Sequence, residues 1–270
     1  PDGAIIQTPF EILFLSAGDS TAAEMTQART LIVAGARSQV RIVETYAALR
    51  NGTYFTNAVT EVFAGEHAVI DHYKVQQEGL EAFHVATMQI HAQRSANVSS
   101  HSFSLGAKFA RNDVNAVLDG EGAEVTLNGL YLADGDRLVD NHTLIDNARP
   151  GCPSHELYKH VLGGKATGVF KGKILVRQAA QKTDSKQNSK TLLLSDDAYM
   201  NSQPALEIYA DDVKCAHGAT VGQIDETSLF YLRSRGLDEA RARNILRRVW
   251  GGRYPPFEWT HRRPDGSCFI

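Results

Sequence analysis

The chain has 270 residues, 43% of them hydrophobic, which is enough to bury a sizeable core. Its 28 basic and 31 acidic residues leave a formal charge of −3, so we expect no broad cationic surface for nucleic acid or anionic lipid. No segment has the run of about 18 uncharged apolar residues that a membrane span needs, and the N-terminus does not have the pattern of a signal peptide. We therefore expect a cytoplasmic protein without nucleic-acid or membrane partners.

Short β-branched or apolar runs, each followed by Gly, Asn or Asp, recur between Thr30 and Gln223. This pattern predicts short strands joined by tight turns. The clearest expected strands are residues 30–35, 39–44, 123–129, 172–177 and 205–210. Turn glycines follow at a nearly regular spacing, although the residues themselves do not repeat.

Regular short strands suit a β-sandwich, a barrel or a β-solenoid, because the helices that a doubly wound sheet needs are scarce. Small polar residues in the middle of a strand, as in residues 92–104, favour the stacked rungs of a solenoid. We therefore predict an all-β core over residues 1–223 that forms a β-helix, with a sandwich as the alternative. The end strands of a solenoid have open edges, which need a cap or a partner.

Residues 154–162 interrupt the strand pattern with helical spacing. Ser154 stands in an N-cap position, Leu157 and Val161 are four residues apart, and Gly163 and Gly164 would end the helix. We expect a short helix here.

A C-terminal helical segment is predicted over residues 224–250. Asp225 can cap a first helix that ends at Gly236, and a second helix begins at Asp238. The second helix has an apolar stripe at helical spacing, made of Ala242, Ile245, Leu246 and Val249. We expect the pair to pack on the β core or to present this stripe to a partner, and we expect the tail, residues 251–270, to be poorly ordered.

Two patterns that suggest enzyme chemistry do not meet its requirements. Gly163, Gly164 and Lys165 fall short of a phosphate-binding loop, because the first glycine of that motif is missing and Ala166 follows the lysine. Three carboxylates, Asp134, Asp136 and Asp140, could serve a glycan-cleaving β-helix enzyme. Since Gly135 lies between the first two, an ordinary turn is favoured. We expect no enzymatic activity, with the glycan-active enzyme as the alternative.

The three cysteines, Cys152, Cys215 and Cys268, are odd in number and far apart, so we expect reduced thiols and a structural role for Cys152. Cys215 and His217 are separated by one residue, and in an extended strand they point to the same face. A thiolate and an imidazole suit iron or zinc, and Lys214 could lower the thiol pKa. Two ligands do not complete a tetrahedral site, so either further ligands come from a second chain or the site is transient. A buried structural pair is the alternative.

Residues 202–223 and 229–236, which contain the Cys-x-His turn, closely resemble SufD-type subunits of the SufB/SufD family, which belongs to the SUF iron–sulfur cluster assembly system. Supporting similarity lies in residues 28–35, 139–145, 156–159 and 182–188. Together the resemblance spans nearly residues 1–248. Relative to this family the chain enters the β core almost directly, so we expect it to be truncated at its N-terminus, and the tail after Val249 no longer resembles the family.

The resemblance implies a right-handed parallel β-helix and a scaffold role without enzymatic turnover. It implies a heterodimer with a SufB-like subunit, and a SufC-like ABC ATPase that docks on the C-terminal helices and hydrolyses the ATP. It also implies that Cys215 and His217 lie at the shared interface, where they hold a transient iron–sulfur cluster, and that the protein is cytoplasmic, or stromal in a plastid. A solenoid without metal chemistry remains a third hypothesis.

Overall fold

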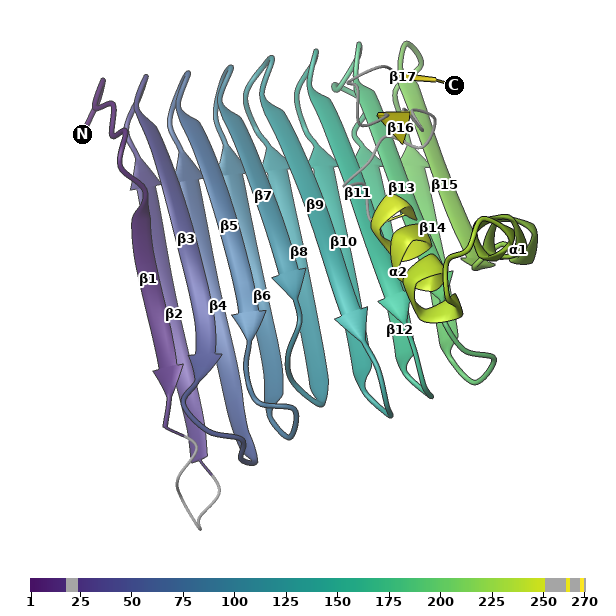
Figure 1. Ribbon diagram of the computed structural model, residues 1–270. Helices are drawn as coiled ribbons and strands as arrows, with labels where there is room; N and C mark the ends of the chain where they lie inside the picture. Colours follow the sequence, from purple (N-terminus) through teal and green to yellow (C-terminus); the bar gives the residue numbers. More distant parts are fainter. Residues whose placement is uncertain (18–23, 251–260, 263–267, 270) are drawn as a thin grey trace.

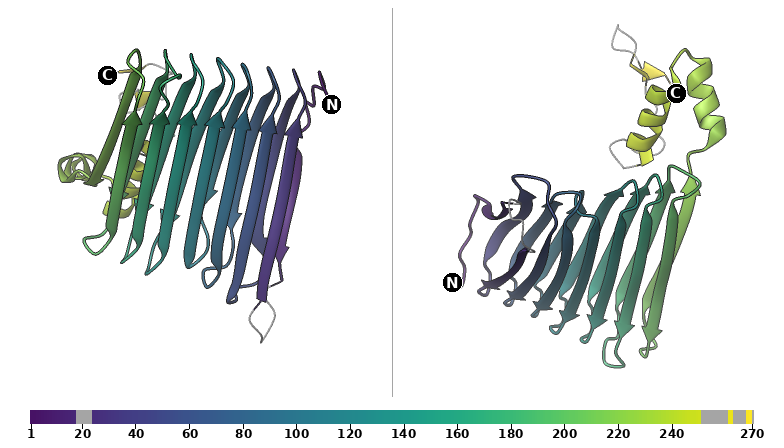
Figure 2. Two further views of the ribbon diagram at one scale, coloured as in Figure 1. Left: turned by 180° about the vertical axis from the view of Figure 1, so that it is seen from behind. Right: turned by 90° about the horizontal axis from the view of Figure 1, so that it is seen from below.

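The computed structural model describes residues 1–17, 24–250, 261–262 and 268–269. Its parallel strands alternate between two sheets: the odd-numbered strands from β1 to β15 form an eight-stranded sheet, and the even-numbered strands from β2 to β14 form a seven-stranded sheet (Figure 1). Since two strands make one turn, the body is a parallel β-solenoid of about seven turns, which confirms the predicted fold class. Figure 2 shows that the first strands and the two helices lie at opposite ends of the stack.

The strands of the solenoid have the following bounds: β1 (Phe10–Ser16), β2 (Glu24–Ala34), β3 (Gln39–Ala48), β4 (Tyr54–Ala64), β5 (Val69–Gln77), β6 (Phe83–Ala92), β7 (Asn97–Ser104), β8 (Phe109–Leu118), β9 (Glu124–Ala133), β10 (Leu138–Asn147), β11 (Pro153–Leu162), β12 (Thr167–Val176), β13 (Asp184–Leu193), β14 (Tyr199–Ile208) and β15 (Lys214–Gln223). After them come the helices α1 (Glu226–Ser234) and α2 (Glu239–Trp250) and two short strands, β16 (His261–Arg262) and β17 (Cys268–Phe269).

Side chains along each strand alternate between the interior and the outside of the solenoid, because successive residues of a strand point to opposite faces. In β8, for example, every second residue is buried. The inward-facing apolar side chains form one core that continues through the stack, from Ile32 near the first turn to Met200 near the last. The register is therefore fixed along the whole body, since a slip by one residue would turn every core side chain outward.

The prediction of a helix at residues 154–162 is wrong. This segment is the strand β11, which pairs with β9 and β13. Its buried residues alternate with period two, and several of them are polar, including Ser154, Glu156 and His160. The helix was predicted from the four-residue separation of Leu157 and Val161, and that spacing does not reveal the period-two burial. Hydrogen bonding to a neighbouring strand on each side then overrides the local preference for a helix.

The two C-terminal helices are confirmed. The Asp225 carboxylate accepts hydrogen bonds from the backbone N–H groups of Thr227 (3.3 Å) and Ser228 (2.9 Å), which is the expected N-cap. Buried Leu229 and Leu232 of α1 and Ala242 of α2 pack against the outer face of the odd-numbered sheet, in one cluster with Leu192, Val161, Ile245 and Leu246. The helices therefore pack on the β core, and only the side chain of Val249 in the predicted stripe lies outside the described part of the chain.

Leu229→Ala is expected to lower the free energy of unfolding of the helical segment by about 3 kcal/mol, because Leu229 is only 2% exposed in this cluster. Both tryptophans, Trp250 and Trp259, lie toward the C-terminus, so urea unfolding followed by tryptophan fluorescence measures the change. Phe230→Ala is the matched control, because Phe230 is 73% exposed and its loss should have little effect. Equal shifts in the two variants would contradict the packing described here.

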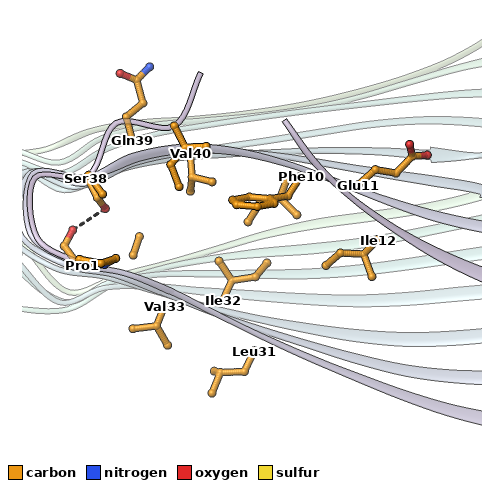
Figure 3. A pocket seen from close by; sticks show the side chains of 15 residues that line it. Pro1, Phe10, Glu11, Ile12, Leu31, Ile32, Val33, Ser38, Gln39 and Val40 are labelled. Atoms are coloured by element: carbon orange, nitrogen blue, oxygen red, sulfur yellow. Dashed lines mark hydrogen bonds between the residues drawn. The ribbon is translucent and has the colours of Figure 1, made fainter. Parts of the chain in front are cut away.

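Both ends of the solenoid have sheet edges that pair with no other strand of the described residues, as predicted. At the N-terminal end, the edge strands are β1 and β2, and the core opens into a hollow of about 320 Å³. Phe10, Ile12, Ile32 and Val40 line this hollow with apolar side chains (Figure 3). At the other end the edge strands are β14 and β15.

Neither helix among the described residues has the length and apolar composition needed to cross a membrane. The tail predicted to be poorly ordered, residues 251–270, lies outside the described residues apart from β16 and β17, which pair with each other in antiparallel fashion.

Candidate functional site

Cys215 and His217 lie on β15, the last strand of the eight-stranded sheet. In the parallel register with β13, Cys215 is the partner of Ser185 and His217 is the partner of Gln187. Ser185 and Gln187 are both buried, whereas Lys186 between them is exposed. Because side chains in register share a face, Cys215 and His217 belong to the inward-facing set, so the prediction that they share one face is confirmed.

The two side chains are more accessible than their partners on β13, because β15 has a neighbouring strand on one side only among the described residues. Cys215 is half-buried and packs against the end of the solenoid core, and His217 is exposed. Burial raises the pKa of the Cys215 thiol, and the nearby Asp184 carboxylate raises it further. The expectation that Lys214 lowers this pKa is therefore wrong, since desolvation has the largest effect. Metal binding at this thiol must displace its proton.

Cys215 and His217 do not belong to any group of three or more His, Cys, Asp or Glu side chains that could hold a metal ion, and no such group occurs in the described part of the chain. The site therefore consists of two candidate ligands at an open edge. A soft metal needs about four ligands for a closed tetrahedral site.

A row of buried polar side chains continues inward from the two candidate ligands. Behind Cys215, the hydroxyls of Ser185 and Ser154 are hydrogen-bonded to each other. Behind His217, Gln187 Nε2 donates a hydrogen bond of 2.6 Å to Glu156 Oε2. Burial raises the pKa of Glu156 to about 7, although its neutral hydrogen-bond partners oppose this shift.

The sequence analysis missed Gln187 and Glu156 as part of the site. Neither residue belongs to a known motif, and both lie far from Cys215 and His217 in the sequence. The offset that could have found them is the length of one solenoid turn, about 30 residues, which places Glu156, Gln187 and His217 at successive register positions.

A second polar cluster lies inside the first half of the solenoid and was also missed. His72 Nε2 lies 3.3 Å from a carboxylate oxygen of Glu44, and His84 Nδ1 lies 2.7 Å from a carboxylate oxygen of Glu78. Lys74 is buried between the same sheets, and burial lowers its pKa to about 8. His84 is also desolvated, which lowers its pKa to about 4, so the histidine is neutral at pH 7.

The three carboxylates of the alternative glycan-active enzyme do not come together at one site. Asp134 and Asp136 lie in the turn between β9 and β10, where the Asp134 carboxylate accepts a hydrogen bond from the N–H of Gly135. Asp140 lies on β10, forms an ion pair with Arg111 (2.7 Å) and lies 3.0 Å from the ring Nε2 of His142. This arrangement corresponds to a turn and a structural ion pair, without two carboxyls facing each other across a cleft.

Two other features of the sequence have structural roles. Cys152 is fully buried, and burial raises the pKa of its thiol, which agrees with the expected structural role. Gly163 and Gly164 form the turn between β11 and β12, with Gly164 at a positive φ of 58°. A tight turn between strands leaves no helix N-terminus for a phosphate group.

Comparison with known proteins places these residues within a characterised family. A family model described as SUF system FeS cluster assembly, SufBD core domain, matches residues 14–248. Curated relatives include an iron–sulfur cluster assembly SufBD family protein of Synechocystis, which is 35% identical over 93% of this chain and 57% of its own length. The iron–sulfur cluster assembly protein SufD of Escherichia coli is 34% identical over 77% of this chain and 49% of its own length. The chloroplastic protein ABCI7 of Arabidopsis thaliana is 29% identical over 91% of this chain and 53% of its own length. The chain thus spans about half the length of these relatives.

Proposed function

The chain belongs to the SufBD core domain family of the SUF system, and on that premise we propose that it is a non-enzymatic scaffold subunit for iron–sulfur cluster assembly. The observation that carries this proposal is the half-complete site on β15, where an inward-facing thiol and an imidazole lie at an open sheet edge. Thiolate and imidazole are both known ligands of iron–sulfur clusters. The cluster is the cargo of this scaffold and is passed on after assembly.

The partner that completes the site is proposed to be a SufB-like subunit. The edge strands β14 and β15 have unpaired backbone groups among the described residues, and exposed apolar side chains such as Tyr209 and Val221 lie on or beside them. Such an edge is suited to pairing with another chain. A heterodimer at this edge would bring the partner's ligands next to Cys215 and His217.

A SufC-like ABC ATPase is proposed to dock on the helices α1 and α2. One face of α1 packs on the solenoid through Leu229 and Leu232, while Phe230 and Tyr231 are 73% and 56% exposed. Exposed aromatic side chains on an amphipathic helix suit a partner's groove. ATP hydrolysis would then take place in the docked subunit. The assembly would be cytoplasmic, or stromal in a plastid.

Anaerobic reconstitution of the chain with SufB-like and SufC-like subunits, followed by iron counting, tests this function. His217→Ala is expected to lose most of the cluster iron, because one of the two ligands from this chain is gone. His155→Ala is the matched control, since His155 lies on β11 of the same sheet but faces outward. Equal iron content in the two variants would contradict the role assigned to His217. A complex that forms normally but holds no iron in the wild type would favour the solenoid without metal chemistry.

A further inference from the structure

Gln187 is the register partner of His217 and lies one turn deeper in the solenoid. Neighbouring strands are about 4.8 Å apart, so the two inward-facing side chains occupy adjacent positions of one row. Gln187 is fully buried, whereas His217 is exposed. The glutamine is thus the first interior side chain that the imidazole would meet on turning inward.

The carboxamide of Gln187 is held firmly on one side. Its Nε2 donates the 2.6 Å hydrogen bond to Oε2 of Glu156, because the amide nitrogen has N–H groups and no acceptor. On the opposite sheet, Gly172 leaves space for the amide, because a Cβ there would lie 2.3 Å from Gln187 Nε2. These contacts fix the position of the amide group in the interior of the solenoid.

The other half of the carboxamide has no partner. Gln187 Oε1 is buried and accepts no hydrogen bond from any residue that the structure describes. A buried acceptor without a donor is uncommon in folded proteins, because the group has lost its water without replacement. Histidine that ligates a metal through one nitrogen nearly always donates its other N–H to a carbonyl or carboxylate oxygen.

We propose that Gln187 is a positioning residue for His217: its Oε1 accepts the hydrogen bond from one ring N–H while the other ring nitrogen binds the metal. This inference rests on the proposed function of His217 as a ligand. The hydrogen bond would select one tautomer and fix the orientation of the ring, since only one nitrogen of a neutral imidazole carries the proton. Glu156 acts one step further back, by holding the amide in place.

Cobalt titration of the full 270-residue chain under reducing, anaerobic conditions tests the inference, with the thiolate-to-cobalt charge-transfer absorption as the readout. Gln187→Met keeps the length of the side chain and removes the oxygen, and it is expected to weaken cobalt binding about tenfold. Gln187→Glu keeps an acceptor oxygen and can share one proton with Glu156 in place of the amide N–H, so it is expected to bind cobalt more tightly than Gln187→Met. Gln76→Met is the matched control: Gln76 is another fully buried glutamine, on β5 and far from β15, and its loss should leave the affinity unchanged.

A second readout separates positioning from a merely structural role. In the zinc-loaded chain with ¹⁵N-labelled histidine, the N–H of the His217 ring is expected to exchange slowly with water, and Gln187→Met should make this exchange fast. The His217→Ala variant identifies the signal. A rapidly exchanging N–H in the zinc-loaded wild type would overturn the inference even if a variant fails to fold.

The cobalt titration distinguishes failure of the proposed metal site at His217 from failure of the positioning role of Gln187. Cobalt binding that does not depend on His217 would overturn the proposed site and this inference with it. Cobalt binding that depends on His217 but is equal in the wild type and in Gln187→Met would overturn the role of Gln187 alone.

Discussion

Glu156→Gln is expected to raise the free energy of unfolding at pH 8 by about 3 kcal/mol and to leave it nearly unchanged at pH 4.5. Glu156 is only 2% exposed, and burial raises its pKa from 4.5 to about 7. Between these values the folded protein holds a proton that the unfolded chain has released, so stability falls as the pH rises through this window. This rise in the pKa of Glu156 corresponds to about 3 kcal/mol of stabilisation of the folded state, and that stabilisation is fully lost above pH 7. Glutamine keeps the shape but carries no charge.

Urea unfolding of the wild type and the variant at a series of pH values measures this effect. The difference between the two curves isolates Glu156, because all other titrating groups are common to both proteins. Glu44→Gln is an informative comparison, since the pKa of Glu44 is lowered in the folded state, with His72 and Thr60 as partners. Loss of the Glu44 carboxylate in this variant should lower the free energy of unfolding at pH 7. A constant difference between wild type and Glu156→Gln from pH 4.5 to pH 8 would show that folding does not raise the pKa of the Glu156 carboxyl.

The fold was predictable to a large extent because the sequence features that specify a solenoid are local. Strands with period-two burial and turns at nearly regular spacing can be recognised in the sequence even without an exact repeat. The segment containing Ser154, Glu156 and His160 was mistaken for a helix because several of its inward-facing side chains are polar. Burial of polar residues depends on partners from neighbouring turns, and a local window does not contain them.

The candidate site was predictable only in part. Cys215 and His217 stand out because two soft ligands two positions apart on a strand share a face. Gln187 and Glu156 do not stand out, since their contact spans a complete turn of the solenoid. The local charge of Lys214 was also a poor guide to the pKa of Cys215, which depends on how deeply β15 packs against the core. Register and burial are properties of the stack, so they follow from the sequence only after the turn length is known.

Gly120→Ala is expected to lower the free energy of unfolding by about 3 kcal/mol or more. A Cβ at Gly120 would lie 1.9 Å from the backbone nitrogen of Arg94 and 2.3 Å from its Cα. These are backbone atoms of the turn below, which the strand ladders hold in place, so the clash cannot be relieved by a side-chain rotation. Thermal and urea unfolding followed by circular dichroism measure the loss.

The control for this variant is Gly222→Ala on the edge strand β15, where no atom lies within 4 Å of the added Cβ. Its effect should stay within about 0.5 kcal/mol.

Gly120 has no positive φ in the structure, so backbone conformation does not explain why glycine is needed there. Gly106 is similar, with a Cβ position 2.2 Å from the carbonyl oxygen of Glu78. At both positions the close approach of successive turns requires glycine, and a loss equal to that of Gly222→Ala would contradict this. If the loss is as large as expected, regularly spaced turn glycines without a positive φ would indicate the stacking distance of a solenoid as well as the places where its chain turns.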